Sequence, residues 1–112
     1  MEIEEKMMNM FQKIIIFLND CRPEHKALFK EIHVWGKKDT ANVGITDFEG
    51  DYYPLEAFST FSHSCKKTVK NAKKEFKAIK TILLKEDGRE DGMFDFGLDL
   101  DTNQVDCKVE YL

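Results

Sequence analysis

The sequence contains little of what extended, disulfide-bonded or membrane-spanning proteins require. Among its 112 residues are six glycines and two prolines, which excludes collagen-like and low-complexity structure. Its three cysteines, Cys21, Cys65 and Cys107, are odd in number and form no C-x-x-C motif, as is typical of a reduced protein. No apolar run is long enough to span a membrane, and the acidic start Met-Glu-Ile-Glu-Glu-Lys is unlike a secretory leader. We therefore expect a cytoplasmic protein with no membrane association.

The sequence also lacks a recognisable catalytic constellation. It contains no glycine-rich phosphate loop and no nucleophile-elbow motif. His25, His33 and His63 lie in different predicted elements and do not have the spacing of metal ligands. Cys65 follows His63 by two residues, but residues two apart on a helix do not face each other. We expect a protein that is not an enzyme and has no cofactor.

One acidic segment matches part of a calcium-loop pattern. Asp99, Asp101, Asn103 and Glu110 occupy positions 1, 3, 5 and 12 of that pattern. Position 6, where the sharp turn requires glycine, is Gln104. The flanking residues alternate with a period of two, which indicates strands and not the two helices of an EF-hand. We predict no metal site here, because an acidic hairpin in solvent explains the same residues.

What the sequence does contain is enough apolar residues for one folded domain over residues 1–112. They make up 42% of the chain and include nine phenylalanines. Apolar residues at helical spacing predict two main helices, at 2–20 and at about 55–76. Alternation and β-branched residues predict shorter strands at 27–35, 41–45, 52–53 and 79–84.

The clearest alternation lies at the C-terminal end, over residues 92–112. Two runs of alternating apolar and charged residues are separated by Thr102-Asn103-Gln104, which predicts an antiparallel hairpin with one apolar and one charged face. The charged face would carry Lys108 and the carboxylates of Asp95, Asp99, Asp101, Asp106 and Glu110. Together these elements predict an α+β fold, in which two main helices pack on an antiparallel sheet of about five to six strands.

The net charge of −4 conceals two segments of opposite sign. Residues 86–106 carry a net charge of −7, because eight acidic residues are opposed by Arg89 alone. Residues 66–85 contain eight lysines opposed only by Glu75. Clustered lysines on a helix are an electrostatic footprint of nucleic-acid binding. No aromatic residues alternate with them and the pI is 5.4, so a solvated face, or one neutralised by the acidic hairpin, explains them without direct nucleic-acid binding.

The density of acidic residues favours a cationic protein partner. Like charges close together on one sheet face reduce stability, so we interpret them as a docking surface. The alternative is that they only keep an edge strand soluble. The predicted contact residues are the carboxylates Asp87, Glu90, Asp91, Asp95, Asp99, Asp101, Asp106 and Glu110, with Trp35, Tyr52 and Tyr53 as aromatic anchors.

The layout resembles bacterial immunity proteins of polymorphic and contact-dependent toxin systems, particularly the YezG-like family and the Maf immunity proteins of Neisseria. The resembling segments are Leu18-Asn19-Asp20-Cys21-Arg22-Pro23, Ile32-His33-Val34-Trp35, Asp51-Tyr52-Tyr53-Pro54 and Gly92-Met93-Phe94-Asp95-Phe96-Gly97-Leu98-Asp99. This resemblance implies a non-catalytic cytoplasmic antidote that binds one cognate toxin domain, often a nuclease. The alternative is a regulatory module that binds a protein, or binds nucleic acid through its lysine-rich helix. A homodimer through an exposed sheet edge is left open.

Overall fold

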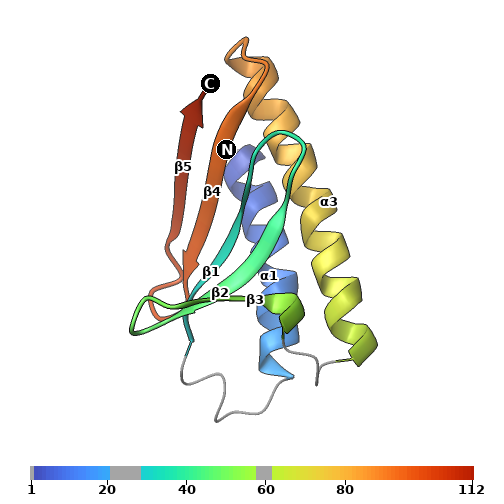
Figure 1. The fold of residues 1–112 in the computed structure, drawn as a ribbon, viewed down its shortest axis with the longest axis vertical. Coiled ribbons are helices and arrows are strands. Elements are labelled where there is room, and N and C mark those ends of the chain that lie inside the picture. Colours follow the sequence, from blue (N-terminus) through green and yellow to red (C-terminus); the bar gives the residue numbers. More distant parts are fainter. Residues whose placement is uncertain (1, 21–28, 58–61) are drawn as a thin grey trace.

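The computed structural model describes residues 2–20, 29–57 and 62–112 (Figure 1). In chain order its elements are α1 (Glu2–Asn19), β1 (Phe29–Gly36), β2 (Asn42–Asp47), β3 (Tyr52–Pro54), the 3₁₀ turn η1 (Leu55–Ala57), α3 (Ser62–Glu86), β4 (Gly92–Asp99) and β5 (Val105–Tyr111). The five strands form one antiparallel sheet in the order β3-β2-β1-β4-β5. The predicted α+β fold, with two main helices on an antiparallel sheet, is confirmed.

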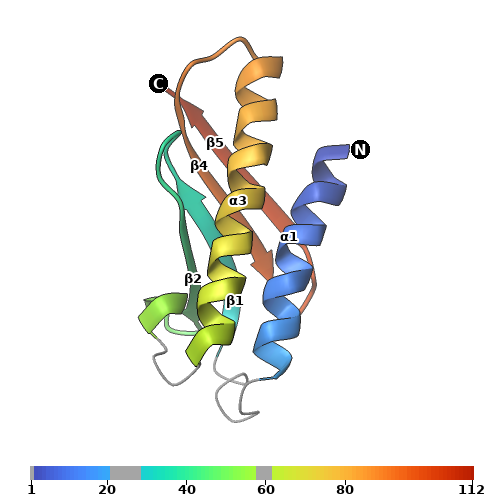
Figure 2. The same ribbon diagram turned by 90° about the vertical axis from the view of Figure 1, so that its right-hand side faces the viewer.

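Both helices lie on the same face of the sheet (Figures 1 and 2). Between them and the sheet is the core, which includes Phe11 and Ile14 of α1, Phe76 of α3, and Phe94 and Phe96 of β4. Complete burial of such a side chain stabilises the fold by about 1.5–3 kcal/mol. No described helix or strand covers the opposite side of the sheet, which we call the open face.

The helix predicted at 2–20 is confirmed as α1. Its buried residues Met7, Met10, Phe11, Ile14 and Leu18 recur at intervals of three and four, so they form one stripe along the helix. No described helix is both long enough and apolar enough to cross a bilayer.

The prediction for residues 55–84 is partly wrong. The predicted second helix at 55–76 is instead the short turn η1 followed, after residues 58–61 that lie outside the described part, by α3. The strand predicted at 79–84 does not form, because α3 continues to Glu86. Ile79 and Leu84 are buried against the core, as are Val69, Ala72 and Phe76 earlier in the helix. Burial of this helical stripe therefore overrides the local β preference of the isoleucines.

The predicted C-terminal hairpin is confirmed as β4 and β5. Phe94, Phe96 and Leu98 are buried, as their alternation requires. β4 ends at Asp99, so Asp101 lies in the turn and not on the strand. β5 is the last strand of the sheet, and its apolar residues are therefore covered less than expected, with Cys107 exposed.

Candidate binding surface on the open face of the sheet

The middle strand β1 sets the composition of the open face. Its residues Ile32 and Val34 are buried on the helix side. Strand side chains alternate between faces, so Glu31, His33 and Trp35 lie on the open face. The register places Asp95 of β4 beside Trp35, and a glycine on each side of His33, Gly44 from β2 and Gly97 from β4.

Three of the predicted acidic contact residues meet on this face. Asp95 pairs with Lys108 of β5 in the register, while Asp106 pairs with Gly97 and Glu110 pairs with Met93. The Lys108 Nζ lies 3.8 Å from the Asp106 Oδ2, and both side chains are largely exposed. An exposed ion pair of this kind contributes little to stability, so Asp95, Asp106 and Glu110 leave a mainly negative strip available to a partner.

The other two carboxylates of the hairpin lie at the start of its turn, Asp99 as the last residue of β4 and Asp101 in the turn itself. The Asp99 Oδ1 accepts backbone hydrogen bonds from the N–H groups of Asp101, at 2.8 Å, and Thr102, at 3.1 Å. These bonds lower the pKa of the Asp99 carboxyl. Asn103 follows with a φ of 60°, a conformation that asparagine tolerates better than most residues. The hydrogen bonds of the Asp99 carboxylate thus stabilise the turn, and the neighbouring Asp101 is exposed to solvent.

The turn between α3 and β4 holds the remaining predicted carboxylates. The Tyr111 hydroxyl donates a hydrogen bond to the Asp87 carboxylate, which raises the pKa of Tyr111 to about 12. The Asp91 Oδ1 accepts hydrogen bonds from the backbone N–H groups of Gly92, at 2.7 Å, and Lys38, at 3.2 Å. Glu90 is exposed in the same turn. Tyr111 shares the helix side of β5 with Val109, so Asp87 lies away from the open face.

Two of the three predicted aromatic anchors are in contact on the open face. The Trp35 Nε1 donates a hydrogen bond to the Tyr52 hydroxyl at 3.0 Å, and the two rings pack edge to face with centroids 6.0 Å apart. The Tyr52 ring covers Gly44, where any added Cβ would approach it to 2.3 Å. Burial, together with the negative charge of Asp95, raises the pKa of Tyr52. Tyr53 has the opposite orientation, and its hydroxyl donates to the Asp47 Oδ2 at 3.1 Å.

His33 is a central residue of the open face that the sequence prediction considered only as a metal ligand. Its Nδ1 lies 3.0 Å from the Asp95 Oδ1, and its Nε2 lies 3.8 Å from the Glu31 Oε2. A Cβ at Gly97 would approach the imidazole Cε1 to 3.2 Å, so the glycine leaves room for the ring. The alternation of His33 with Trp35 along one strand was the signal that could have placed it here. Of the other histidines, His25 lies outside the described residues, as does the side chain of His63.

A small hollow lies between Trp35 and the C-terminal hairpin. Its volume is about 250 Å³, and its lining residues are Trp35, Met93, Phe94, Asp95, Lys108, Val109 and Glu110. This volume is below the roughly 300–1,000 Å³ of small-molecule sites, but it suits one large side chain. The hollow has an indole wall, a methionine and two carboxylates against one lysine, Lys108, whose Nζ lies 3.8 Å from the Asp106 Oδ2 outside the hollow. The hollow is therefore suited chemically to an arginine or lysine of a partner.

A second acidic cluster lies in the turn between β2 and β3. Carboxylate oxygens of Asp47, Glu49 and Asp51 lie within 4.8 Å of one another. The Asp47 Oδ1 accepts backbone hydrogen bonds from Glu49, at 2.9 Å, and Asp51, at 3.0 Å. The cluster is therefore explained by the hydrogen bonding of the turn. The segment with the calcium-like spacing, 99–110, begins at the end of β4 and runs into β5, so both of its ends lie in strands, as predicted, and not in helices.

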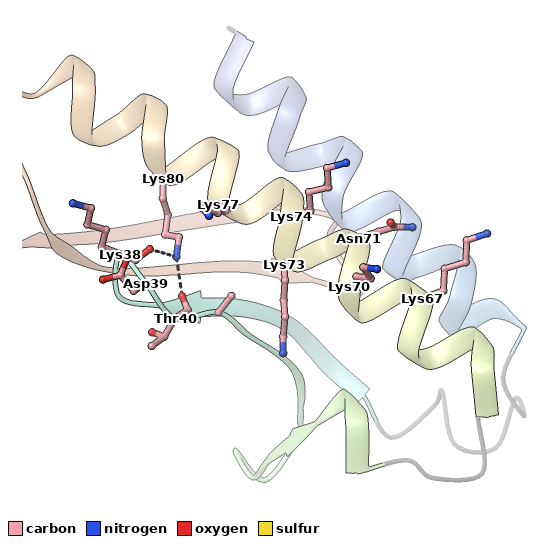
Figure 3. A pocket seen from close by; sticks show the side chains of 11 residues that line it. Lys38, Asp39, Thr40, Lys67, Lys70, Asn71, Lys73, Lys74, Lys77 and Lys80 are labelled. Atoms are coloured by element: carbon pink, nitrogen blue, oxygen red, sulfur yellow. Dashed lines mark hydrogen bonds between the residues drawn. The ribbon is translucent and has the colours of Figure 1, made fainter.

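The lysine-rich helix lines a groove on the other layer of the molecule (Figure 3). The groove lies between α3 and the turn that joins β1 to β2, and its volume is about 750 Å³. We call it the lysine groove, and its lysines are Lys38, Lys67, Lys70, Lys73, Lys74, Lys77 and Lys80. Among the described residues, Lys73 is the only lysine of α3 that forms an ion pair, and its Nζ lies 3.0 Å from the Glu56 Oε1. The acidic hairpin does not neutralise this surface in the described part of the chain.

Comparisons of the chain with protein-family models, curated proteins and solved structures found no match.

Proposed function

We propose that this protein is an immunity protein, which binds and neutralises a cognate toxin domain through the open face of its sheet. The observation that carries the proposal is the hollow beside Trp35, where an aromatic wall meets the carboxylates of Asp95 and Glu110. Tryptophan and tyrosine are the residues most enriched among binding hot spots. Trp35 and Tyr52 already hold each other in place, so binding would order few additional side chains.

The electrostatics support a cationic partner, and a nuclease is the toxin class that fits best. A nuclease presents a positive groove to the phosphates of its substrate, and an acidic face can occupy that groove without any catalytic chemistry. Opposite charges would also accelerate the encounter between the two proteins. The short strand β3 and the long strands β1 and β4 hold the contact side chains on a rigid sheet, which favours a preorganised interface.

The test is to mix the purified protein with the toxin domain encoded by the neighbouring gene and to measure association kinetics at increasing salt. The association rate should fall by about tenfold or more as salt screens the open face. Reversing Asp95 and Glu110 to lysine should weaken binding by about 10–100-fold, and Trp35→Ala by a similar factor.

Glu5→Lys is the matched control, because Glu5 is exposed on α1, on the helix side of the sheet. It changes the net charge by the same amount per substitution and should leave the affinity within about twofold. Asp95 also contacts His33, so each variant is checked by thermal unfolding. A tight complex that is insensitive to both open-face variants would contradict the proposal.

A second candidate function is nucleic-acid binding in the lysine groove. Two observations favour it. The lysines on α3 and in the turn before β2 line a concave surface, and most of these lysines have no ion-pair partner among the described residues. Fluorescence anisotropy with a labelled oligonucleotide should then show binding that weakens steeply with salt. Lys70→Glu with Lys77→Glu should abolish it, whereas Lys108→Glu on the open face should not. No anisotropy change at low salt would exclude this function.

A further inference from the structure

Within the described part of the chain, the outer edge of β5 carries backbone groups that are not paired with another strand. β5 is the last strand of the sheet, and no described segment pairs with its outer side (Figure 1). At one end of the hairpin the Asp99 N–H donates to the Gln104 carbonyl, and at the other the Leu112 N–H donates to the Asp91 carbonyl. In an antiparallel pair every second residue directs its backbone groups to the same neighbour. Residues 106, 108 and 110 therefore face β4, whereas residues 105, 107 and 109 direct their N–H and C=O groups outward.

An apolar groove adjoins this edge on the helix side. Its volume is about 530 Å³, and it is lined by Ile3, Glu4, Met7, Met8, Leu83, Glu86, Val105 and Cys107. Val105 is half-buried and Cys107 is exposed, although both side chains point to the layer of the core. Exposed backbone groups beside an apolar groove are what an added strand would cover.

The charge sequence of β5 indicates which strand fits. Asp106, Lys108 and Glu110 alternate in sign along the open face. If a second β5 lies antiparallel with Cys107 opposite Cys107, then Asp106 of each copy lies opposite Lys108 of the other. The same register places Val105 opposite Val109 and pairs the outward backbone groups of residues 105, 107 and 109.

Other registers are less favourable. With Lys108 on the two-fold axis, lysine would face lysine and Asp106 would face Glu110, which are like-charge pairs. With Val109 on the axis, Lys108 would meet Glu110, but the apolar groove beside Val105 and Cys107 would lie away from the axis. The register centred on Cys107 pairs Asp106 of each copy with Lys108 of the other and brings the two grooves together.

We propose that two copies of this chain associate edge to edge through β5, antiparallel and with the two-fold axis at Cys107. The result is one continuous sheet across both copies, with the helices of both on the same side. The open face of each copy stays accessible, so this association does not depend on the proposed toxin binding. A single pair of edge strands forms a small interface, and we expect a dissociation constant on the order of 1–100 µM.

The test is sedimentation velocity of the whole chain over a range from about 5 to about 500 µM, which brackets weak interfaces of this kind. The native protein should change from monomer to dimer across this range. Lys108→Glu should weaken the dimer at least about tenfold, because it places like charges opposite Asp106. The double variant D106K/K108D should restore association, since it exchanges the two charges and keeps their complementarity. Lys74→Glu, on α3, is the control for net charge and should leave the dimer unchanged.

Hydrogen exchange of the native protein provides a readout that needs no substitution. The amides of residues 105, 107 and 109 should exchange rapidly in dilute samples and more slowly in concentrated ones, whereas those of 106 and 108 should not change. Native protein that remains monomeric at the highest concentration would overturn the proposal. So would a dimer that Lys108→Glu leaves intact. Loss of association in Lys108→Glu without recovery in D106K/K108D would show that the register is wrong.

Discussion

At the scale of single residues, Lys80 shows how a charged side chain becomes part of the core. It is only 2% exposed, and its ammonium donates hydrogen bonds to the carbonyl oxygens of Lys37, at 2.6 Å, Lys38, at 3.1 Å, and Thr40, at 2.7 Å. The same nitrogen lies 4.3 Å from the centre of the Phe76 ring. Burial lowers the pKa of Lys80, but the three carbonyls replace water as hydrogen-bond partners. Lys80 thereby attaches α3 to the turn between β1 and β2 (Figure 3).

We predict that Lys80→Met lowers the free energy of unfolding by about 1–3 kcal/mol. Methionine fills a similar volume, but it leaves the carbonyls of the turn without their charged donor. Urea unfolding measures the change. The matched control is Lys77→Met on the exposed side of the same helix, which should alter stability by less than about 0.5 kcal/mol. Equal stability of the two variants would contradict the attachment role of Lys80.

At the scale of secondary-structure elements, the length of α3 determines how many strands the sheet has. Residues 79–84 contain two isoleucines and a threonine, which locally favour a strand. In the fold they continue the helix, and Ile79 and Leu84 reach the core. The Thr81 hydroxyl donates to the Lys77 carbonyl at 2.9 Å, one helical turn earlier. A sheet of five strands results.

Thr81→Pro tests this helical assignment. Proline removes a backbone hydrogen bond and clashes with the preceding turn, so we expect a loss of about 3 kcal/mol or more in unfolding free energy and a reduced helical circular-dichroism signal. Thr81→Ala keeps the backbone N–H and should change stability by less than about 0.5 kcal/mol. If both variants were equally stable, residues 79–84 would not be helical.

At the scale of the whole molecule, the two charged segments lie on different layers. The acidic strip of β4 and β5 lies on the open face, while the lysine groove follows α3 on the helix layer (Figure 3). Lysines three or four residues apart on a helix repel each other. Because the acidic hairpin does not pair with them among the described residues, this repulsion persists in the folded protein.

Lys74→Glu should therefore stabilise the protein at low salt. The new carboxylate would lie one helical turn from both Lys70 and Lys77, so we expect a gain of about 0.5–1.5 kcal/mol that disappears near 1 M salt. Urea unfolding at low and high salt measures the difference. Lys74→Gln removes the repulsion without adding attraction and should give about half of the gain. A gain that persists at high salt would indicate a cause other than charge.

The periodicity of the sequence correctly predicted the helices and strands that have one side buried along their whole length. Met7 to Leu18 recur at helical spacing because one side of α1 is buried throughout, and Phe94 to Leu98 alternate because β4 has one covered face. The strand predicted at 79–84 is wrong, because this segment fits both a strand and a helix pattern and forms part of α3. Asp87 and Tyr53, two of the predicted contact residues, are hydrogen-bonded to Tyr111 and Asp47 away from the open face, a placement that depends on the tertiary structure.

The sequence by itself determined the class of the fold, the helix α1, the C-terminal hairpin and the separation of acidic from basic segments, because each depends on residues close together in the chain. Only the tertiary structure decided that α3 extends to Glu86, and that Tyr52, Trp35, His33 and Asp95 share one surface. Those side chains come from β3, β1 and β4, which the strand order brings together. Pairing between distant strands depends on how the whole sheet is buried under its helices, and no local period encodes that.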